Sequence, residues 1–416
     1  MLSSRVEVII KTRSEGRGAL SNNQSNEFPL SGFKVLDFSR VLAGPFAGRM
    51  LCDLGADVVK VEPPDGDITR LWGAKIGGIP GYYSQQNAGK KNICIDLRAE
   101  GARELVFALV EQADILIENY RPDVMPRLGL GYDSLKEINP KLIMLSISGF
   151  GHDGPESHRP AYAPIIHAET GLMARQSKRG DIPYTDLPLS VADTNASLHG
   201  LVGLLSAVIH RDRIGVGQHI DIAMMDTVLV TDDQLHYDIE SSEDSGPLRN
   251  DTWETGVGPI LVSADFRWLW KNLVRHFESF RDSGTDNMEL EQKIRTRREI
   301  VGRYMAKLET WGEVESVFAK MNIAWGKVRD PRKMREQETV ISRGSITEID
   351  DRAGGLRPIP QSPYRFSNAR SEVQGSAKHR GEDNFSVLSS WIGRSQKDVQ
   401  ALIDSGVLSR DEEFLD

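Results

Sequence analysis

Short segments typical of strands alternate with segments typical of helices along the first half of the chain, and no other feature constrains the fold more. The strand segments are rich in β-branched residues, as in Asp-Val-Val-Lys-Val-Glu at 57–62. This alternation predicts an α/β fold with a doubly wound, mostly parallel sheet and right-handed crossovers. We predict strands over 35–38, 57–62, 92–97, 114–118, 142–148 and 219–224, and helices over 46–54, 100–112, 134–138 and 225–238.

The loops that follow these strands are the candidate binding loops, because ligands of such sheets bind beyond the carboxyl ends of the strands. They are Ser39–Pro45, Glu62–Asp67 and Asn119–Arg127. No Gly-x-Gly-x-x-Gly fingerprint opens the first helix. The domain is therefore predicted to be Rossmann-like but without a dinucleotide site.

The length of the chain predicts more than one domain, since 416 residues exceed the roughly 250–300 at which a single core stops growing. Polar and Pro-rich stretches suggest where the boundaries lie. We predict a flexible leader (1–27), a large α/β domain (28–240), a linker (241–252), a smaller α+β domain (253–353), and a crossover with C-terminal helices that return to the large domain (354–416).

Composition excludes several classes of function. The net charge of −9 argues against a general nucleic-acid binder, and an anionic ligand would need a local basic cluster. The longest apolar run, Leu198–Ile209, falls short of a membrane span. The histidines show no metal-ligand spacing, so no metal site is predicted. Glu7 and Glu15 in the leader disfavour a mitochondrial transit peptide, and a cytoplasmic location is the prediction.

Basic residues stand at the ends of several predicted strands. Arg98 follows the third strand, Arg121 and Arg127 follow the fourth, and Lys60 lies within the second. Guanidinium groups bind phosphate well, but arginines near strand ends are also common salt-bridge partners. Both interpretations stay open on the sequence alone.

Asp193 is the most ambiguous carboxylate of the chain, since it stands just before the long apolar run of a predicted helix. Aspartate in this position is usually an N-cap, which would lower its pKa and its nucleophilicity. Thr194 or Asn195 could cap the helix instead and leave Asp193 free to attack an acyl group. The sequence permits both arrangements.

Several separated blocks, in order, resemble one family. They include Val35-Leu36-Asp37-Phe38-Ser39-Arg40-Val41-Leu42-Ala43-Gly44-Pro45, Leu54-Gly55-Ala56-Asp57-Val58-Val59-Lys60-Val61-Glu62, Glu118-Asn119-Tyr120-Arg121-Pro122 and Gly215-Val216-Gly217-Gln218-His219-Ile220-Asp221. Together they resemble the class III coenzyme A transferases, the CaiB/BaiF or formyl-CoA transferase family. The resemblance is strong from Leu30 to about Asp226 and weaker beyond.

The resemblance implies roles for individual residues. It makes Asp193 the catalytic nucleophile. It places one group along the coenzyme: Val41, Leu42, Ala43, Arg98, Asn119, Tyr120 and Arg127. A further group is the candidate acyl pocket: Tyr162, His167 and Glu169. It also implies an interlocked homodimer, with a coenzyme A thioester as substrate and no permanently bound cofactor.

Three positions depart from the family pattern. Pro63 stands where some members carry an arginine at the nucleotide. The glycine-run loop that shields the intermediate is not visible, and Gly256 and Gly258 are the nearest candidates for such a lid. Ala163 stands where the racemase branch of the family carries a proton-moving aspartate.

The implied activity is transfer of coenzyme A from an acyl-CoA to a carboxylic acid, through an aspartyl anhydride and an aspartyl-CoA thioester. Such covalent catalysis splits one difficult exchange into easier steps. Two alternatives remain. An acyl-CoA racemase or isomerase would need an acid–base pair, which His167 and Glu169 could supply. A CoA-binding protein without catalytic activity would need only the coenzyme contacts.

Overall fold

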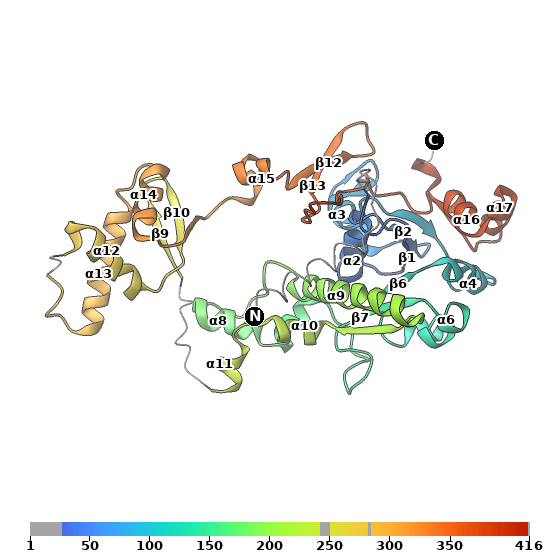
Figure 1. The fold of residues 1–416 in the computed structure, drawn as a ribbon, viewed down its shortest axis with the longest axis horizontal. Coiled ribbons are helices and arrows are strands. Elements are labelled where there is room, and N and C mark those ends of the chain that lie inside the picture. Colours follow the sequence, from blue (N-terminus) through green and yellow to red (C-terminus); the bar gives the residue numbers. More distant parts are fainter. Residues whose placement is uncertain (1–26, 242–249, 282–283, 415–416) are drawn as a thin grey trace, which may run out of the picture. The chain divides into compact units, whose positions relative to one another are not determined.

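A six-stranded parallel sheet organises the larger part of the molecule, in a computed structural model that describes residues 27–241, 250–281 and 284–414. The strands lie in the order β5-β2-β1-β6-β7-β8, and every neighbouring pair is parallel. The predicted doubly wound sheet is therefore confirmed (Figure 1). The bounds are β1 (Lys34–Asp37), β2 (Asp57–Glu62), β5 (Lys91–Cys94), β6 (Ile115–Glu118), β7 (Ile143–Ser148) and β8 (His219–Ala223).

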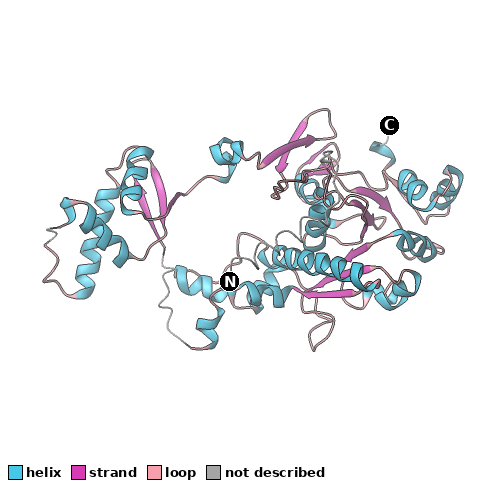
Figure 2. Ribbon diagram, viewed as in Figure 1, coloured by secondary structure: helices cyan, strands magenta, loops and turns pink. Residues whose placement is uncertain are grey.

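Helices cover both faces of this sheet (Figure 2). Successive side chains of the strands point to opposite faces, and both faces are apolar, so both must be buried. Val35, Ile117 and Leu145 pack with α2 (Ala43–Asp53), α9 (Val191–Ile214) and α10 (Met224–Thr231). On the other face, the strands pack with α4 (Ala102–Gln112), α6 (Tyr132–Ile138), α16 (Asn384–Ile392) and α17 (Gln396–Asp404). The site described below lies at the carboxyl edge between these layers.

The chain divides into two compact units. The first comprises the chain up to Asp233 together with the segment from Gly344 onwards, and the second spans Gln234–Arg343. The returning segment pairs β12 (Ile346–Asp350) with β13 (Leu356–Pro360) in an antiparallel hairpin. Leu408 then forms a bridge with Ile95, which follows β5.

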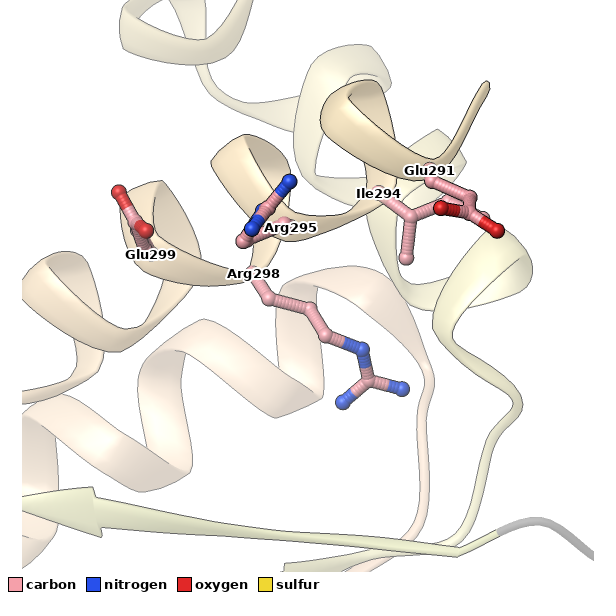
Figure 3. A pocket seen from close by; sticks show the side chains of 5 residues that line it. All are labelled: Glu291, Ile294, Arg295, Arg298 and Glu299. Atoms are coloured by element: carbon pink, nitrogen blue, oxygen red, sulfur yellow. The ribbon is translucent and has the colours of Figure 1, made fainter. Parts of the chain in front are cut away.

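The second unit has its own core. An antiparallel sheet of β9 (Asp251–Thr255), β10 (Gly258–Val262) and β11 (Trp325–Lys327) packs with α12 (Phe266–His276), α13 (Leu290–Met305) and α14 (Trp311–Met321). A hollow on α13 is lined by Glu291, Ile294, Arg295, Arg298 and Glu299 (Figure 3). All five residues come from one helix, and Arg298 pairs with Asp251 at 3.1 Å, so the hollow is a charged surface and not a built site.

One sequence prediction needs correction. The helix predicted over 225–238 is interrupted, because Asp232 adopts an extended conformation and pairs with Arg175 of α8 (Leu172–Gly180). The chain resumes as α11 (Leu235–Ile239). The linker predicted over 241–252 lies mostly outside the described residues, and its last two residues begin β9.

Within the described parts of the chain, no helix combines the length and the apolar character that crossing a membrane requires. The same residues hold no group of three His, Cys, Asp or Glu side chains placed to bind a metal ion.

Candidate active site

A cavity of about 280 Å³ lies at the carboxyl edge of the parallel sheet, between the loops that follow β1 and β6. These two strands are neighbours, yet the chain runs outward from them in opposite directions across the sheet. Such a switch point is where open α/β sheets bind ligands. The lining residues are Arg40, Val41, Ala43, Asn119, Tyr120, Arg121, Pro122, Ile147, Ser148, Gly149, Ser157, Arg159, Pro160, Ala161, Tyr162, Asp193 and Met224.

Asp193 lines this cavity from the first turn of α9, and only 8% of the residue is exposed. Burial raises the pKa of its carboxyl group to about 6. A backbone hydrogen bond with Ala43, the nearby His167 and a backbone hydrogen bond with Ala163 oppose this shift. The carboxylate is therefore poorly hydrated yet still held by hydrogen bonds.

Asp193 does not cap its helix. The N-cap is Ser190, whose side chain makes no capping bond, and Asp193 is the third residue of α9. Its hydrogen bonds come instead from the first residues of α2 and of α7 (Ala163–Glu169). The first turns of three helices thus meet at one carboxylate, and each contributes the partial positive charge of its N-terminus. The capping interpretation was wrong because the helix begins earlier than the apolar run.

His167 is turned into the protein beside the start of α9, and 1% of it is exposed. Its Nε2 accepts the Ala192 N–H at 3.2 Å, and its Nδ1 lies 2.8 Å from the Asp186 carboxylate. Because Nε2 accepts a hydrogen bond, the proton of the ring sits on Nδ1. Both ring nitrogens are therefore engaged in holding the N-terminus of α9 in place.

The other two members of the predicted acyl pocket differ in whether they line the cavity. Tyr162 lines the cavity. Glu169 does not line it, and its carboxylate pairs with Arg159 at 2.6 Å. Arg159 also binds Glu156, so two carboxylates share its charge.

Four of the predicted coenzyme residues line the cavity: Val41, Ala43, Asn119 and Tyr120. The Asn119 side chain joins the two loops, because its Oδ1 accepts the Arg40 N–H and its Nδ2 donates to the Arg40 carbonyl, both at 2.8 Å. The Arg40 guanidinium lies over the Tyr120 ring, 5.6 Å from its centroid.

The remaining predicted coenzyme residues lie outside the cavity. Leu42 is buried as the N-cap of α2. Arg127 pairs with Asp123 at 3.2 Å, and Arg98 is exposed beyond β5, the edge strand of the sheet. Lys60, considered a phosphate ligand from the sequence, is buried and pairs with Asp67 at 3.2 Å, so it does not face a ligand.

Gly256 and Gly258 belong to the second unit, Gly256 in the turn after β9 and Gly258 as the first residue of β10. The Thr255 hydroxyl donates to the Gly258 carbonyl at 2.6 Å and accepts the Val257 N–H at 3.3 Å. A side chain at Gly256 would come within 3.0 Å of the Leu308 carbonyl oxygen. The turn is thus closely packed against its own unit.

Sequence reasoning missed three residues near Asp193. Arg40 and Arg159 line the cavity. Tyr82 is half-buried, and its pKa is raised to about 12 by burial and by the charges of Asp193 and Asp67. Arg40 could have been found, since it adjoins Val41 in a predicted binding loop. Tyr82 gave no such signal because it lies in a segment without a recognised motif.

The arrangement suits acyl chemistry. A carboxylate that has lost most of its hydration is a better nucleophile than one in water. Backbone N–H groups beside it can stabilise the oxyanion that forms when an acyl carbon is attacked. Arg40 and Arg121 give the cavity positive charge that suits an anionic substrate.

Comparisons with known proteins agree on one family. A family model described as CoA-transferase family III matches residues 30–384. A succinate–glutarate CoA-transferase of Agrobacterium fabrum is 30% identical over 383 residues, which cover 86% of this chain and 95% of that protein. A succinyl-CoA:mesaconate CoA-transferase of Haloarcula hispanica is 33% identical over 379 residues, which cover 85% and 95%. The acetyl-CoA:oxalate CoA-transferase of Acetobacter aceti is 42% identical over 202 residues, and the match spans only 52% of its length.

Solved structures give the same picture. A crystal structure of a CaiB/BaiF family protein from Brucella suis superposes with a TM-score of 0.73 at 28% identity, covering 88% of this chain and all of that one. The protein Rv3272 from Mycobacterium tuberculosis superposes with a TM-score of 0.72 at 27% identity, covering 86% and 99%.

Proposed function

The chain belongs to CoA-transferase family III, and from that premise we propose that it moves coenzyme A from an acyl-CoA to a carboxylic acid with Asp193 as nucleophile. Family membership confirms the resemblance drawn from the sequence and makes the protein a transferase. The observation that carries the proposal is the buried Asp193 carboxylate, which faces a cavity lined by arginines.

The proposed reaction begins when an Asp193 oxygen attacks the carbonyl carbon of the donor thioester. The carbon–sulfur bond breaks, leaving a mixed anhydride and the CoA thiolate. The thiolate then attacks the Asp193 carbonyl, which releases the donor acid and forms an aspartyl-CoA thioester. The acceptor carboxylate runs these two steps in reverse, so the acyl-CoA bond is rebuilt and Asp193 is restored. The backbone groups of Ala43 and Ala163 that hydrogen-bond Asp193 are the proposed donors that stabilise the oxyanions.

The coenzyme is proposed to lie along Val41, Leu42 and Ala43 and to continue past Asn119 and Tyr120. Arg98 and Arg127 lie outside the cavity and would contact the nucleotide end of the molecule. The turn at Gly256 and Gly258 is proposed as the element that shields the anhydride from water. Coenzyme A is thus a substrate and not a resident cofactor.

Small carboxylic acids are the proposed acceptor class. The relatives named above act on oxalate, succinate, glutarate or mesaconate by their names, and all of these are small acids with more than one carboxylate. The cavity beside Asp193, about 280 Å³ in volume, is large enough for such a small acid. Arg40 and Arg121 are the candidates to bind a second carboxylate.

A homodimer is proposed because α9 is apolar on the face turned away from the sheet. Leu198, Val202 and Ile209 are exposed there in the single chain. A helix that is apolar on all sides is normally buried on all sides. A second copy of the chain would cover these residues.

Replacement of Asp193 by Ala tests the proposal directly. Wild-type protein, incubated with several acyl-CoA donors and a panel of carboxylates, should exchange acyl groups and carry a CoA adduct on Asp193 that mass spectrometry detects. Asp193→Ala should lose transfer by at least about 10³-fold and carry no adduct, because the substitution removes the proposed nucleophile. Coenzyme A binding, measured by calorimetry, should survive. Near-normal turnover of the Ala variant would remove Asp193 from this role.

Racemisation is the weaker candidate function. It needs an acid–base pair at the α-carbon, but the two residues considered for this are engaged elsewhere, His167 with Ala192 and Asp186 and Glu169 with Arg159. Incorporation of deuterium at the α-carbon of an acyl-CoA, without any acceptor acid, would favour it. Tight CoA binding with neither reaction would favour a binding protein.

A further inference from the structure

We infer that the buried ion pair of Lys60 and Asp67 positions the loop Ser39–Ala43 so that the Ala43 N–H is directed at Asp193. The inference rests on the proposed function, since it assigns a purpose to that N–H group. Neither Lys60 nor Asp67 lines the cavity, so both would act as positioning residues and not as catalytic ones.

The loop needs such a restraint because its backbone is strained. Val41 has a φ of 68°, a left-handed conformation that a β-branched residue rarely adopts. Strain of this kind persists only where the surroundings enforce it. The Val41 N–H donates to the two carboxylate oxygens of Asp67, at 3.2 and 3.4 Å.

The ion pair holds the loop on both sides of the strained residue. Lys60 Nζ donates to the Ser39 carbonyl at 2.7 Å and lies 3.2 Å from Asp67. Both side chains are 1% exposed. Asp67 is itself fixed, because its N–H donates to Glu62 at 2.9 Å and its carboxylate accepts the Thr69 N–H at 3.0 Å. The carbonyl of Ser39 and the N–H of Val41 are thus anchored to one rigid pair.

The position of the loop sets the position of the Ala43 N–H. Leu42 is the N-cap of α2, and its carbonyl accepts the Phe46 N–H at 2.8 Å. Ala43 follows at once, with its backbone hydrogen-bonded to Asp193 and its carbonyl accepting the Ser197 hydroxyl of α9. A loop released at Val41 would therefore move a donor away from the carboxylate on which the proposed chemistry takes place.

The test compares three variants. Asp67→Asn removes the charge but keeps an acceptor and the ability to cap the turn at Thr69, so the fold should survive. Lys60→Met removes the donor to the Ser39 carbonyl and keeps a buried apolar side chain of similar length. It still tests the inference if Asp67→Asn proves unstable. Asp53→Asn is the matched control, because it breaks the equally buried pair of Arg49 and Asp53 at the other end of α2, at 2.7 Å.

Two measurements are made on each full-length variant. In steady-state transfer assays, Asp67→Asn and Lys60→Met should lower kcat by about 10- to 100-fold and change the KM for acyl-CoA by less than about threefold, since small misplacements cost rate more than binding. Hydrogen–deuterium exchange of the peptide spanning 39–44 should accelerate by about tenfold or more in both. Asp53→Asn should leave kcat and the exchange of that peptide at wild-type values.

Equal effects of Asp67→Asn and Asp53→Asn on kcat would overturn the inference, and so would unchanged exchange in the loop peptide. If the wild-type protein transfers no acyl group, the proposed function fails. The exchange measurement then still decides whether the ion pair orders the loop, so the two failures are distinguishable.

Discussion

At the scale of single residues, the molecule keeps one carboxylate in surroundings that disfavour its charge. Asp193 is buried, and burial raises its pKa to about 6 from an ordinary 3.8. Backbone hydrogen bonds from two neighbouring helix starts lessen this cost without removing it. A buried carboxyl group with a raised pKa in a cavity is typical of an active site.

The free-energy cost of burying the charged Asp193 carboxylate should lower the stability of the folded protein. A raised folded-state pKa means that folding favours the protonated carboxyl, so the penalty on the folded state grows as the pH rises from 3.8 and is fully present above about 6. Asp193→Asn removes the charge, and we expect it to stabilise the protein by on the order of 2 kcal/mol at pH 8. The difference should shrink as the pH falls through 6 and vanish below 3.8, where both states are protonated. Thermal unfolding between pH 4 and 8 measures it, and a pH-independent difference would contradict the assignment.

The sequence predicted the neighbourhood of the site better than the orientation of its side chains. Asp193, Val41 and Tyr120 line one cavity as the motifs indicated. His167 and Arg127 do not, because the first hydrogen bonds to its own surroundings and the second pairs with Asp123 on the surface. The position of a residue in the sequence predicts the loop in which it lies. It does not predict which neighbouring residue will form a hydrogen bond or an ion pair with it.

At the scale of elements, the junction of β1 and α2 is the most demanding part of the fold. The chain must turn from the strand into the helix while Ser39 bonds to Asp37, so the start of α2 lies directly against the loop. Gly44 permits this approach. A β-carbon there would lie 2.1 Å from that of Ser39 and 2.3 Å from its hydroxyl oxygen.

Gly44→Ala should therefore destabilise the protein by about 1–3 kcal/mol, the usual cost of overpacking, and lower kcat because the loop must move to relieve the clash. Denaturant unfolding and transfer assays measure the two effects. Gly81→Ala, at the start of α3 (Gly81–Asn87), is the matched control because no atom lies within 4 Å of the added carbon. Equal changes in stability and in kcat for Gly44→Ala and Gly81→Ala would contradict the role of close packing at Gly44.

The six strands of the parallel sheet were predicted to within three residues at every end, because β-branched runs bounded by Gly, Pro and Asp indicate strands in an alternating pattern. The interruption of the predicted helix at Asp232 was not foreseen. Its cause is an ion pair with Arg175, some sixty residues earlier in the chain, which local periodicity does not encode. The switch point between β1 and β6 likewise required the strand order, which the sequence left open.

At the scale of the whole molecule, the chain builds its sheet domain from two separate segments. The second unit is inserted between Asp233 and Gly344, and the returning segment supplies α16, whose Val387 and Leu388 pack with α4 in the core of the sheet. The catalytic candidates all come from the segment before the insertion. The segment after it completes the core of the sheet on the side of α4.

The final prediction concerns the exposed face of α9, where Leu198, Val202 and Ile209 are 45%, 65% and 56% exposed. These residues cost free energy in water, and a second copy of the chain is the proposed cover. Val202→Lys places a charge in the middle of that face and should convert a dimer to a monomer without unfolding it. Size-exclusion chromatography with light scattering measures the mass, and circular dichroism checks the fold.

Leu290→Lys is the matched control, since Leu290 is 70% exposed in the second unit and lies outside α9. A Val202→Lys variant that keeps the mass of the wild type would show that α9 is not the interface, and a wild-type monomer at all concentrations would rule out the dimer itself.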